Sequence, residues 1–177
     1  RIHALGGRDP AACWIRPWGG QWRLILFDLP IDQTDLRKQL WRVLRRHHLG
    51  YLQGSVWATP DHAGKLRASL GEAPVDPESF LIMEGRPAAG ETDAEIVEAA
   101  WDFSLINRRY KQYLHFIEKP ATVDARLPEW ARRENAAWKA AAQLDPFLPR
   151  ALHPKGYLGM EAFRRRKLVF AGLAAEP

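Results

Sequence analysis

The pattern of apolar and polar positions predicts alternating strands and helices in the first half of the chain. Residues 21–29 are mostly apolar and predict a buried strand, which Pro30 ends because proline has no N–H to donate to a sheet. From about Thr34 the apolar residues recur at helical spacing, and the basic residues fall on another face. Residues 51–59 are rich in strand-forming types and contain Gly54, so they predict a second strand with a bulge.

Two shorter segments complete this pattern. Residues 61–70 predict a short helix, and residues 79–85 predict a third strand. The order strand, helix, strand, helix, strand, with short connections, is typical of a small α+β sandwich of the ferredoxin-like type. A fourth strand is not evident in the sequence.

From Glu91 onward the spacing of apolar residues is helical. We expect a helical segment over 94–119 that is interrupted near Asp102, a second helix over 128–143 and a terminal helix over 160–173. The proline-containing stretch between the last two predicts a connector.

These elements predict an α+β fold with a ferredoxin-like central domain and an α-helical C-terminal region. We place the ferredoxin-like domain at residues 21–88 and the helical domain at residues 89–177. Residues 1–20 hold several glycines, two prolines and isolated tryptophans without periodicity, so they predict a linker.

Composition restricts the class of protein. No run of about 18 uncharged apolar residues occurs and the N-terminal residues lack the apolar stretch of a signal peptide, so we expect a cytoplasmic protein without a membrane partner. The single cysteine, Cys13, can form no intrachain disulfide. A net charge of +5 and a pI near 9.6 favour a polyanionic partner. The basic residues gather in three runs, each of which could equally be a solvated helix face. These runs are Arg37, Lys38, Arg42, Arg45 and Arg46; Arg108, Arg109 and Lys111; and Arg164, Arg165, Arg166 and Lys167.

One acid, Asp28, raises the question of catalysis. An aspartate at the end of an apolar strand can hold a metal ion that polarises a phosphate, or it can end the strand and form a turn. No G-x-S-x-G frame, Walker-type loop or G-x-G-x-x-G motif occurs. We therefore expect no enzyme, no catalytic residue and no cofactor, and we keep a metal-dependent nuclease centred on Asp28 as the alternative.

The eight tryptophans are more than a core of this size needs. Trp22 and Trp57 lie in predicted strands and are expected in the core. Trp101, close in sequence to Arg108 and Arg109, could form an aromatic-plus-basic pocket for an anionic aromatic ligand.

Three motifs carry a family resemblance. The stretch "PWGGQWRLILFDLPIDQTDLRKQLWRVLRRHHLGYLQGSVWATP", together with "AWDFSLINRRYKQYLHF" and "LDPFLPRALHPKGYLG", resembles PaaX-type transcriptional repressors over nearly the whole chain. The matching positions in the first motif are Trp22, Phe27, Asp28, Pro30, Leu36, Arg37, Gly50, Gly54, Trp57 and Pro60. Those in the other two are Trp101, Tyr110, Asp145, Pro146, Leu148 and Pro149. Lys155, Gly156 and Tyr157 depart from the family, which usually carries an acidic residue and a tryptophan there.

The resemblance implies the regulatory and dimerisation part of a repressor of aromatic, phenylacetate-type catabolism. Such proteins combine an N-terminal winged helix that binds operator DNA, a central domain similar to small CRISPR-associated nucleases, and a helical C-terminal domain. They are released from DNA by an aryl-CoA thioester. We therefore expect a homodimer, with Arg45, Arg46, Trp101, Arg108 and Arg109 as candidates for effector binding. Because the sequence starts at Arg1 and its first methionine is Met83, we expect that the winged helix is missing.

Overall fold

The computed structural model describes residues 9–30, 32–62, 64, 70–71, 75–76, 79–118 and 127–175. The chain divides into two compact units, which are described separately. The α/β unit consists of the described residues of Cys13–Trp101 and Pro146–Pro154. The helical unit consists of those of Arg1–Ala12, Asp102–Asp145 and Lys155–Pro177.

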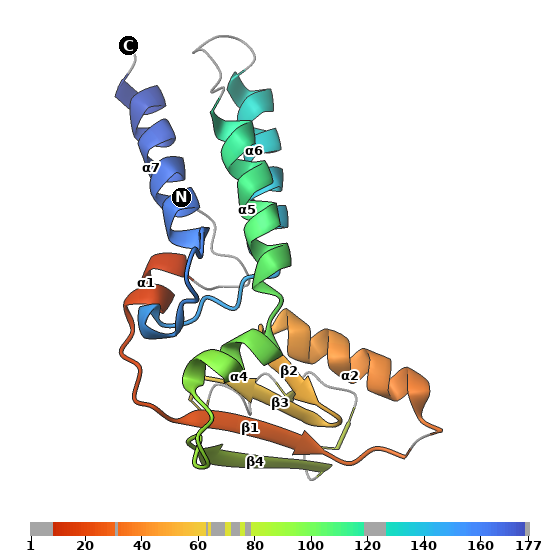
Figure 1. The fold of residues 1–177 in the computed structure, drawn as a ribbon. Coiled ribbons are helices and arrows are strands. Elements are labelled where there is room, and N and C mark those ends of the chain that lie inside the picture. Colours follow the sequence, from red (N-terminus) through yellow and green to blue (C-terminus); the bar gives the residue numbers. More distant parts are fainter. Residues whose placement is uncertain are drawn as a thin grey trace. The chain divides into compact units, whose positions relative to one another are not determined.

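The α/β unit is built on a four-stranded antiparallel sheet (Figure 1). Its strands are β1 (Trp22–Phe27), β2 (Gly50–Gln53), β3 (Val56–Thr59) and β4 (Phe80–Gly85). Their order is β2-β3-β1-β4, so the first strand of the chain lies between the third and the fourth. This is the strand order of a ferredoxin-like domain, and the predicted fold class is confirmed.

The fourth strand comes from a segment that was predicted as one bulged strand. Residues 51–59 form two strands, β2 and β3, which pair antiparallel and are joined by a tight turn at Gly54 and Ser55. Gly54 has a φ of +53°, a conformation that glycine adopts without steric cost. The prediction of a bulge within one strand was therefore wrong, because this glycine reverses the chain. The helix predicted over 61–70 falls mostly outside the described residues.

Helices cover the two faces of this sheet. Helix α2 (Thr34–Arg46) packs Leu40 and Leu44 into a cluster with Ile25, Phe27 and Trp57. Helix α4 (Asp93–Ala100) contacts β2. A Cβ added to Gly50 would overlap the Ala100 and Trp101 side chains, whereas its neighbour Tyr51 packs on the cluster under α2. Because successive strand residues point to opposite faces, α4 and α2 lie on opposite sides of the sheet.

The segment expected to be a linker contains a short helix. Pro10–Ile15 form α1, and Trp14 is only 3% exposed, with its ring 6.1 Å from that of Phe147. Phe147 belongs to the connector that ends in the 3-10 helix η2 (Arg150–Leu152) and is itself fully buried. Trp14 is thus a core residue. The sequence did not predict this, because no apolar residues recur around Trp14 at a helical or strand spacing.

The helical unit consists of α5 (Phe103–Ile117), α6 (Leu127–Ala142) and α7 (Gly159–Ala175). Both α6 and α7 contact α5 (Figure 1). The predicted interruption at Asp102 is confirmed, since its carboxylate caps α5 by accepting a hydrogen bond from the Leu105 N–H at 2.8 Å. None of the described helices is long and apolar enough to cross a membrane.

Candidate functional site

Asp28 follows β1 directly and is exposed to solvent. The turn after it is held by backbone contacts. The Gln33 N–H donates to the Pro30 carbonyl at 3.1 Å, and the Arg37 guanidinium donates to the Leu29 carbonyl at 2.8 Å. Within the described ranges, no group of three or more His, Cys, Asp or Glu residues could hold a metal ion. Asp28 thus stands at the end of β1, a position that both of its interpretations share.

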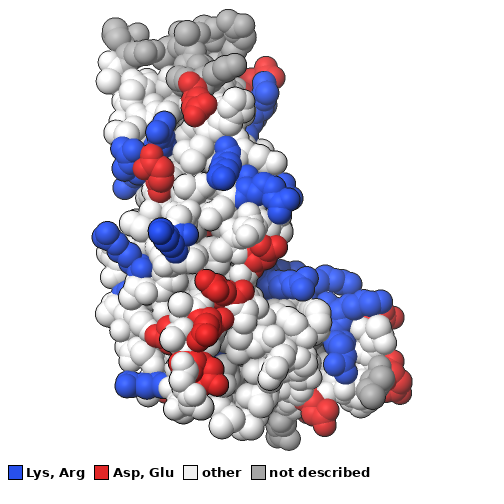
Figure 2. Space-filling model, in the orientation of Figure 1, with Lys and Arg blue, Asp and Glu red and all other residues white. Residues whose placement is uncertain are grey.

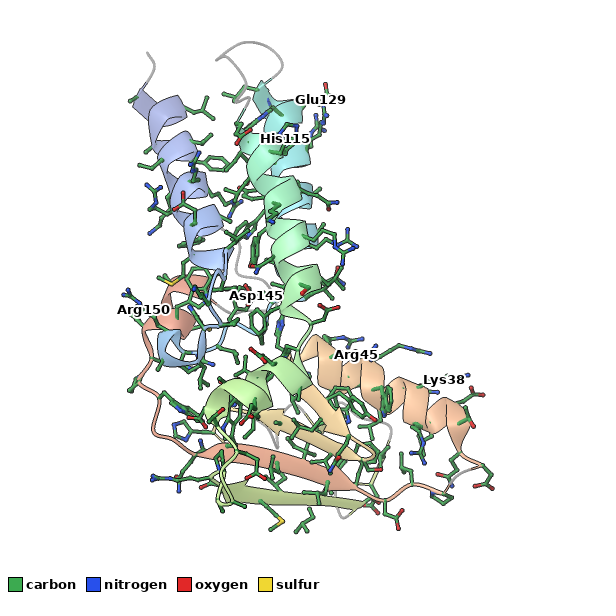
Figure 3. The ribbon with its side chains drawn as sticks, viewed as in Figure 1. Lys38, Arg45, His115, Glu129, Asp145 and Arg150 are labelled. Atoms are coloured by element: carbon green, nitrogen blue, oxygen red, sulfur yellow. The ribbon has the colours of Figure 1, made fainter. Side chains whose placement is uncertain are left out.

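Arg45 and Arg46 lie in the last turn of α2, and both are exposed. Together with Lys38 and Arg42 they form what we call the α2 basic stripe, on the side of the helix away from Leu40 and Leu44. Figure 3 shows Lys38 and Arg45 on the side of α2 that is turned away from the sheet. The Arg45 guanidinium lies 5.6 Å from the ring centroid of Trp41, which supports the side chain without neutralising its charge.

Trp101 is a structural residue of the α/β unit. It is 8% exposed, its indole N–H donates to the His48 carbonyl at 3.2 Å, and its ring lies against Gly50. Its ring centroid is 6.1 Å from that of Trp22, whose own indole N–H donates to the Asp93 carboxylate at 2.8 Å. The polar atom of Trp101 is thus already bonded within the fold.

Arg108 and Arg109 are exposed on α5, whose buried residues include Ile106, Tyr110 and Tyr113. They belong to the helical unit, whereas Trp101 belongs to the α/β unit. Their joining with Trp101 in one ligand pocket stays a prediction.

The helical unit contains a buried ion pair that sequence reasoning missed. Arg166 donates from Nε and Nη2 to the two carboxylate oxygens of Glu134, at 2.7 and 3.0 Å, and both side chains are almost fully buried. Tyr113 donates to the same carboxylate at 2.6 Å, and the Arg166 guanidinium lies 5.1 Å from the Trp138 ring centroid. Burial, with the nearby Glu134, raises the pKa of the Tyr113 phenol well above its usual range.

A second buried carboxylate, Asp145, accepts hydrogen bonds from two tyrosines. Tyr110 donates to it at 2.5 Å, and Tyr157 donates to the same oxygen. Burial, with Asp145 beside it, raises the pKa of Tyr110 well above its usual range. Gly159 leaves room for the Tyr157 ring, which a Cβ would overlap. Tyr157, where the sequence departs from the repressor pattern, is therefore half-buried and hydrogen-bonded to the buried Asp145.

The sheet also carries an apolar patch on the face opposite α2. In the β1–β4 pairing, Leu24 lies opposite Met83 and Leu26 lies opposite Leu81. Leu81 is 58% exposed and Met83 is 49% exposed, although both are large apolar residues. We call these four residues the apolar sheet face. Soluble proteins rarely expose contiguous apolar surface without a use for it.

The strand order defines a ferredoxin-like domain, and comparison with known proteins shows which domain it is similar to. Residues 15–97 match the PaaX protein central Cas2-like domain. This match confirms, for the central domain, the resemblance found in the sequence.

A comparison with solved structures bears on the fold alone. The structure is similar to that of the uncharacterized protein Rv0674 from Mycobacterium tuberculosis, with a TM-score of 0.67 and 18% sequence identity. The likeness covers 93% of this chain and 65% of that chain, so this chain spans about two thirds of the length of its neighbour. No curated protein matches the sequence.

Proposed function

We propose that the chain is the regulatory and dimerisation portion of a PaaX-type transcriptional repressor that responds to an aryl-CoA thioester. The observation that carries this proposal is the match of residues 15–97, most of the α/β unit, to the PaaX central domain. The repressor function, the phenylacetate-type target genes and a winged helix that binds the operator all follow from the family resemblance. In this proposal, the effector binds one conformational state of the repressor more tightly and thereby lowers its affinity for DNA.

The exposed arginines are the candidates for the phosphates of the effector. Arg108 and Arg109 on α5, and Arg45 and Arg46 on α2, are exposed and carry planar donors suited to phosphate oxygens. Trp101 is the less favoured partner for the aryl group, because its indole is packed and hydrogen-bonded within the α/β unit.

A calorimetric titration with phenylacetyl-CoA tests the effector. We expect saturable heat with this chain, and a loss of affinity of about tenfold or more in the arginine pair that contacts phosphate, since hydrogen bonds to charged groups contribute about 1.5–3 kcal/mol. The variants are Arg108→Gln with Arg109→Gln, and Arg45→Gln with Arg46→Gln. No heat, together with operator binding by the complete repressor that is indifferent to the thioester, would disprove the effector.

The apolar sheet face supports the dimer. β4 is the edge strand of the sheet within the described part of the chain, and on the face opposite α2 it exposes the apolar side chains of Leu81 and Met83. If two β4 strands pair about a two-fold axis through Ile82, Leu81 of one copy lies opposite Met83 of the other. The apolar rows of two sheets then join across the pair, an isologous arrangement that closes as a dimer.

Light scattering tests this dimer with a matched control. Leu81→Arg should convert a dimer into a monomer, whereas Leu168→Arg should leave it intact, since Leu168 is exposed to nearly the same extent, 59%, but lies on α7. A dimer that survives Leu81→Arg, or a wild-type chain that is monomeric at all concentrations, would rule out this surface.

A further inference from the structure

We propose that the α2 basic stripe, Lys38, Arg42, Arg45 and Arg46, binds the sugar-phosphate backbone of duplex DNA. It would be a second, sequence-independent DNA contact, made by the central domain itself. The proposal rests on the proposed function as a DNA-bound repressor for its choice of polyanion. The proposed function assigns DNA binding to a separate winged helix, and this contact would be added to it.

The core fixes the direction of the stripe. Leu40, Val43 and Leu44 are buried under α2, so the exposed positions between them form one continuous row on the opposite side. From Lys38 to Arg46 the row is about 12 Å long at 1.5 Å of rise per residue. A row of this length can reach more than one phosphate of a DNA strand, because the strand carries one negative charge per about 3.4 Å of helix axis.

Two charges of the stripe, those of Arg42 and Arg45, are available to a partner, and a third, that of Lys38, is only weakly paired. Helix α2 has one acid, Asp35, whose contact with Lys38 is long, 3.5 Å, and lies between side chains that are 62% and 90% exposed. Such an exposed pair contributes little. Within the part of the chain that the structure describes, Arg42 and Arg45 form no ion pair. In Figure 2 the Lys and Arg side chains over α2 form one blue patch.

In the basic run of α7, by contrast, the arginines are paired with acids of the same unit. Arg164 and Arg165 both donate to Glu161 at 2.8 Å, and Arg166 is buried on Glu134. Of the runs on α2 and α7, the one on α2 therefore holds two exposed arginines, Arg42 and Arg45, that form no ion pair with the described residues.

The shape of the stripe favours a nucleic-acid backbone over other anions. Its side chains leave a helix in a row and do not converge on one point, as a pocket for a single phosphate group requires. The apolar residues of α2 are turned into the core, so the helix offers no apolar side for insertion into a lipid surface. A DNA duplex fits both features, because its phosphates are spread along a line and its backbone needs no apolar partner.

Fluorescence anisotropy of a labelled duplex of random sequence tests the contact with the 177-residue chain. We compare Arg42→Gln with Arg45→Gln against a control, Arg164→Gln with Arg165→Gln, which removes the same two charges from α7. Each phosphate contact contributes about 0.9 to the slope of log affinity against log salt concentration. The α2 variant should lower this slope by about 1.8 and weaken binding, while the α7 control should leave the slope unchanged.

Three results would overturn the proposal. They are the absence of duplex binding by the wild-type chain at low salt, an equal loss in the α2 and α7 variants, and an unchanged slope in the α2 variant. A fourth concerns the source of the phosphate. If phenylacetyl-CoA displaces the duplex at one equivalent and the α2 variant loses thioester binding, the stripe is the effector site instead.

The effector response separates this inference from the proposed function. A complete repressor that still binds its operator and is released by the thioester, but shows no α2-dependent slope, refutes the stripe and leaves the repressor intact. A chain that binds duplex through α2 but does not respond to the thioester refutes the proposed effector and leaves the DNA contact of the stripe intact.

Discussion

Helices α2 and α7 carry basic runs that look alike in the sequence, yet the structure uses them in opposite ways. On α7, Arg166 is 6% exposed and paired with Glu134, and its two neighbours Arg164 and Arg165 share Glu161. On α2, the side chains of Lys38, Arg42, Arg45 and Arg46 are exposed, and the helix has a single acid, Asp35. The difference teaches that the fate of a basic run depends on two things. One is whether the apolar stripe of the helix passes through it, and the other is whether an acid stands three or four residues earlier.

The largest expected effect comes from breaking the buried pair of α7. Arg166→Met should lower the free energy of unfolding by about 3–5 kcal/mol, because it leaves the carboxylate of Glu134 buried without its cation. Urea denaturation followed by circular dichroism measures this loss.

A control and a rescue keep this test specific. Arg165→Met, one residue away but exposed, should cost less than about 1 kcal/mol. Adding Glu134→Leu to Arg166→Met should recover much of the loss, since an apolar pair can replace a buried ion pair. If Arg165→Met and Arg166→Met lower the free energy of unfolding equally, the buried ion pair of Arg166 contributes no more than the exposed one of Arg165, and the contrast is wrong.

The next effect concerns the tyrosines of the helical unit. The pKa of both Tyr110 and Tyr113 is raised by burial and by the adjacent carboxylates, so both stay protonated where a free phenol ionises. The stability that they contribute is complete below about pH 10 and is lost as the pH rises above it. Tyr113→Phe should cost about 1.5–3 kcal/mol at neutral pH, and it should flatten this alkaline decline.

Ultraviolet titration of tyrosinate provides the independent measurement. Replacing Tyr110 or Tyr113 by Phe should leave the amplitude of the ionisation step near pH 10 unchanged in the folded protein. A smaller step in either variant would mean that the replaced phenol ionises normally and is not protected.

A smaller effect distinguishes the exposed part of the α7 run. Hydrogen bonds from Arg164 and Arg165 lower the pKa of Glu161 from 4.5 to about 2. A carboxyl whose pKa is depressed by folding stabilises the fold above its unfolded pKa, and this stability disappears as the pH falls from about 4.5 to 2. Glu161→Gln should therefore weaken the acid dependence in this window. Thermal melts at low salt, recorded between about pH 4.5 and 2, compare the variant with the wild type. If both lose stability to the same extent, the role given to Glu161 is wrong.

The smallest expected effect belongs to the α2 basic stripe. Arg42→Gln with Arg45→Gln should change the free energy of unfolding by no more than about 0.5 kcal/mol, because both side chains are exposed and form no ion pair with the described residues. Urea denaturation beside Arg166→Met makes the contrast direct. A loss above about 1 kcal/mol would show that the stripe is structural.

Much of the fold was predictable because the periodicity of apolar residues is strong in most elements. The first strand, the amphipathic α2 and the cap at Asp102 all carry local signals that the structure confirms. The hairpin of β2 and β3 was missed because Gly54 was interpreted as a bulge, although Gly54-Ser55 is also a two-residue turn that can join hairpin strands.

The buried charges were less predictable for a different reason. Arg166 occupies a place in the apolar stripe of α7, three residues after Phe163 and four before Phe170. Glu134 holds a similar place on α6, four residues before the buried Trp138. A charged residue in an apolar stripe is a usable signal, but the sequence does not say which acid meets which base, because the two are 32 residues apart.

The central place of β1 also has a mechanical consequence. Because β1 is hydrogen-bonded to β3 on one side and to β4 on the other, a pull along it loads two antiparallel ladders in shear at once. A strand held on one side only would peel away bond by bond under the same force. Tension applied to the residues before Trp22 is therefore shared by both ladders. The strand can leave the sheet only when the hydrogen bonds of both ladders break together.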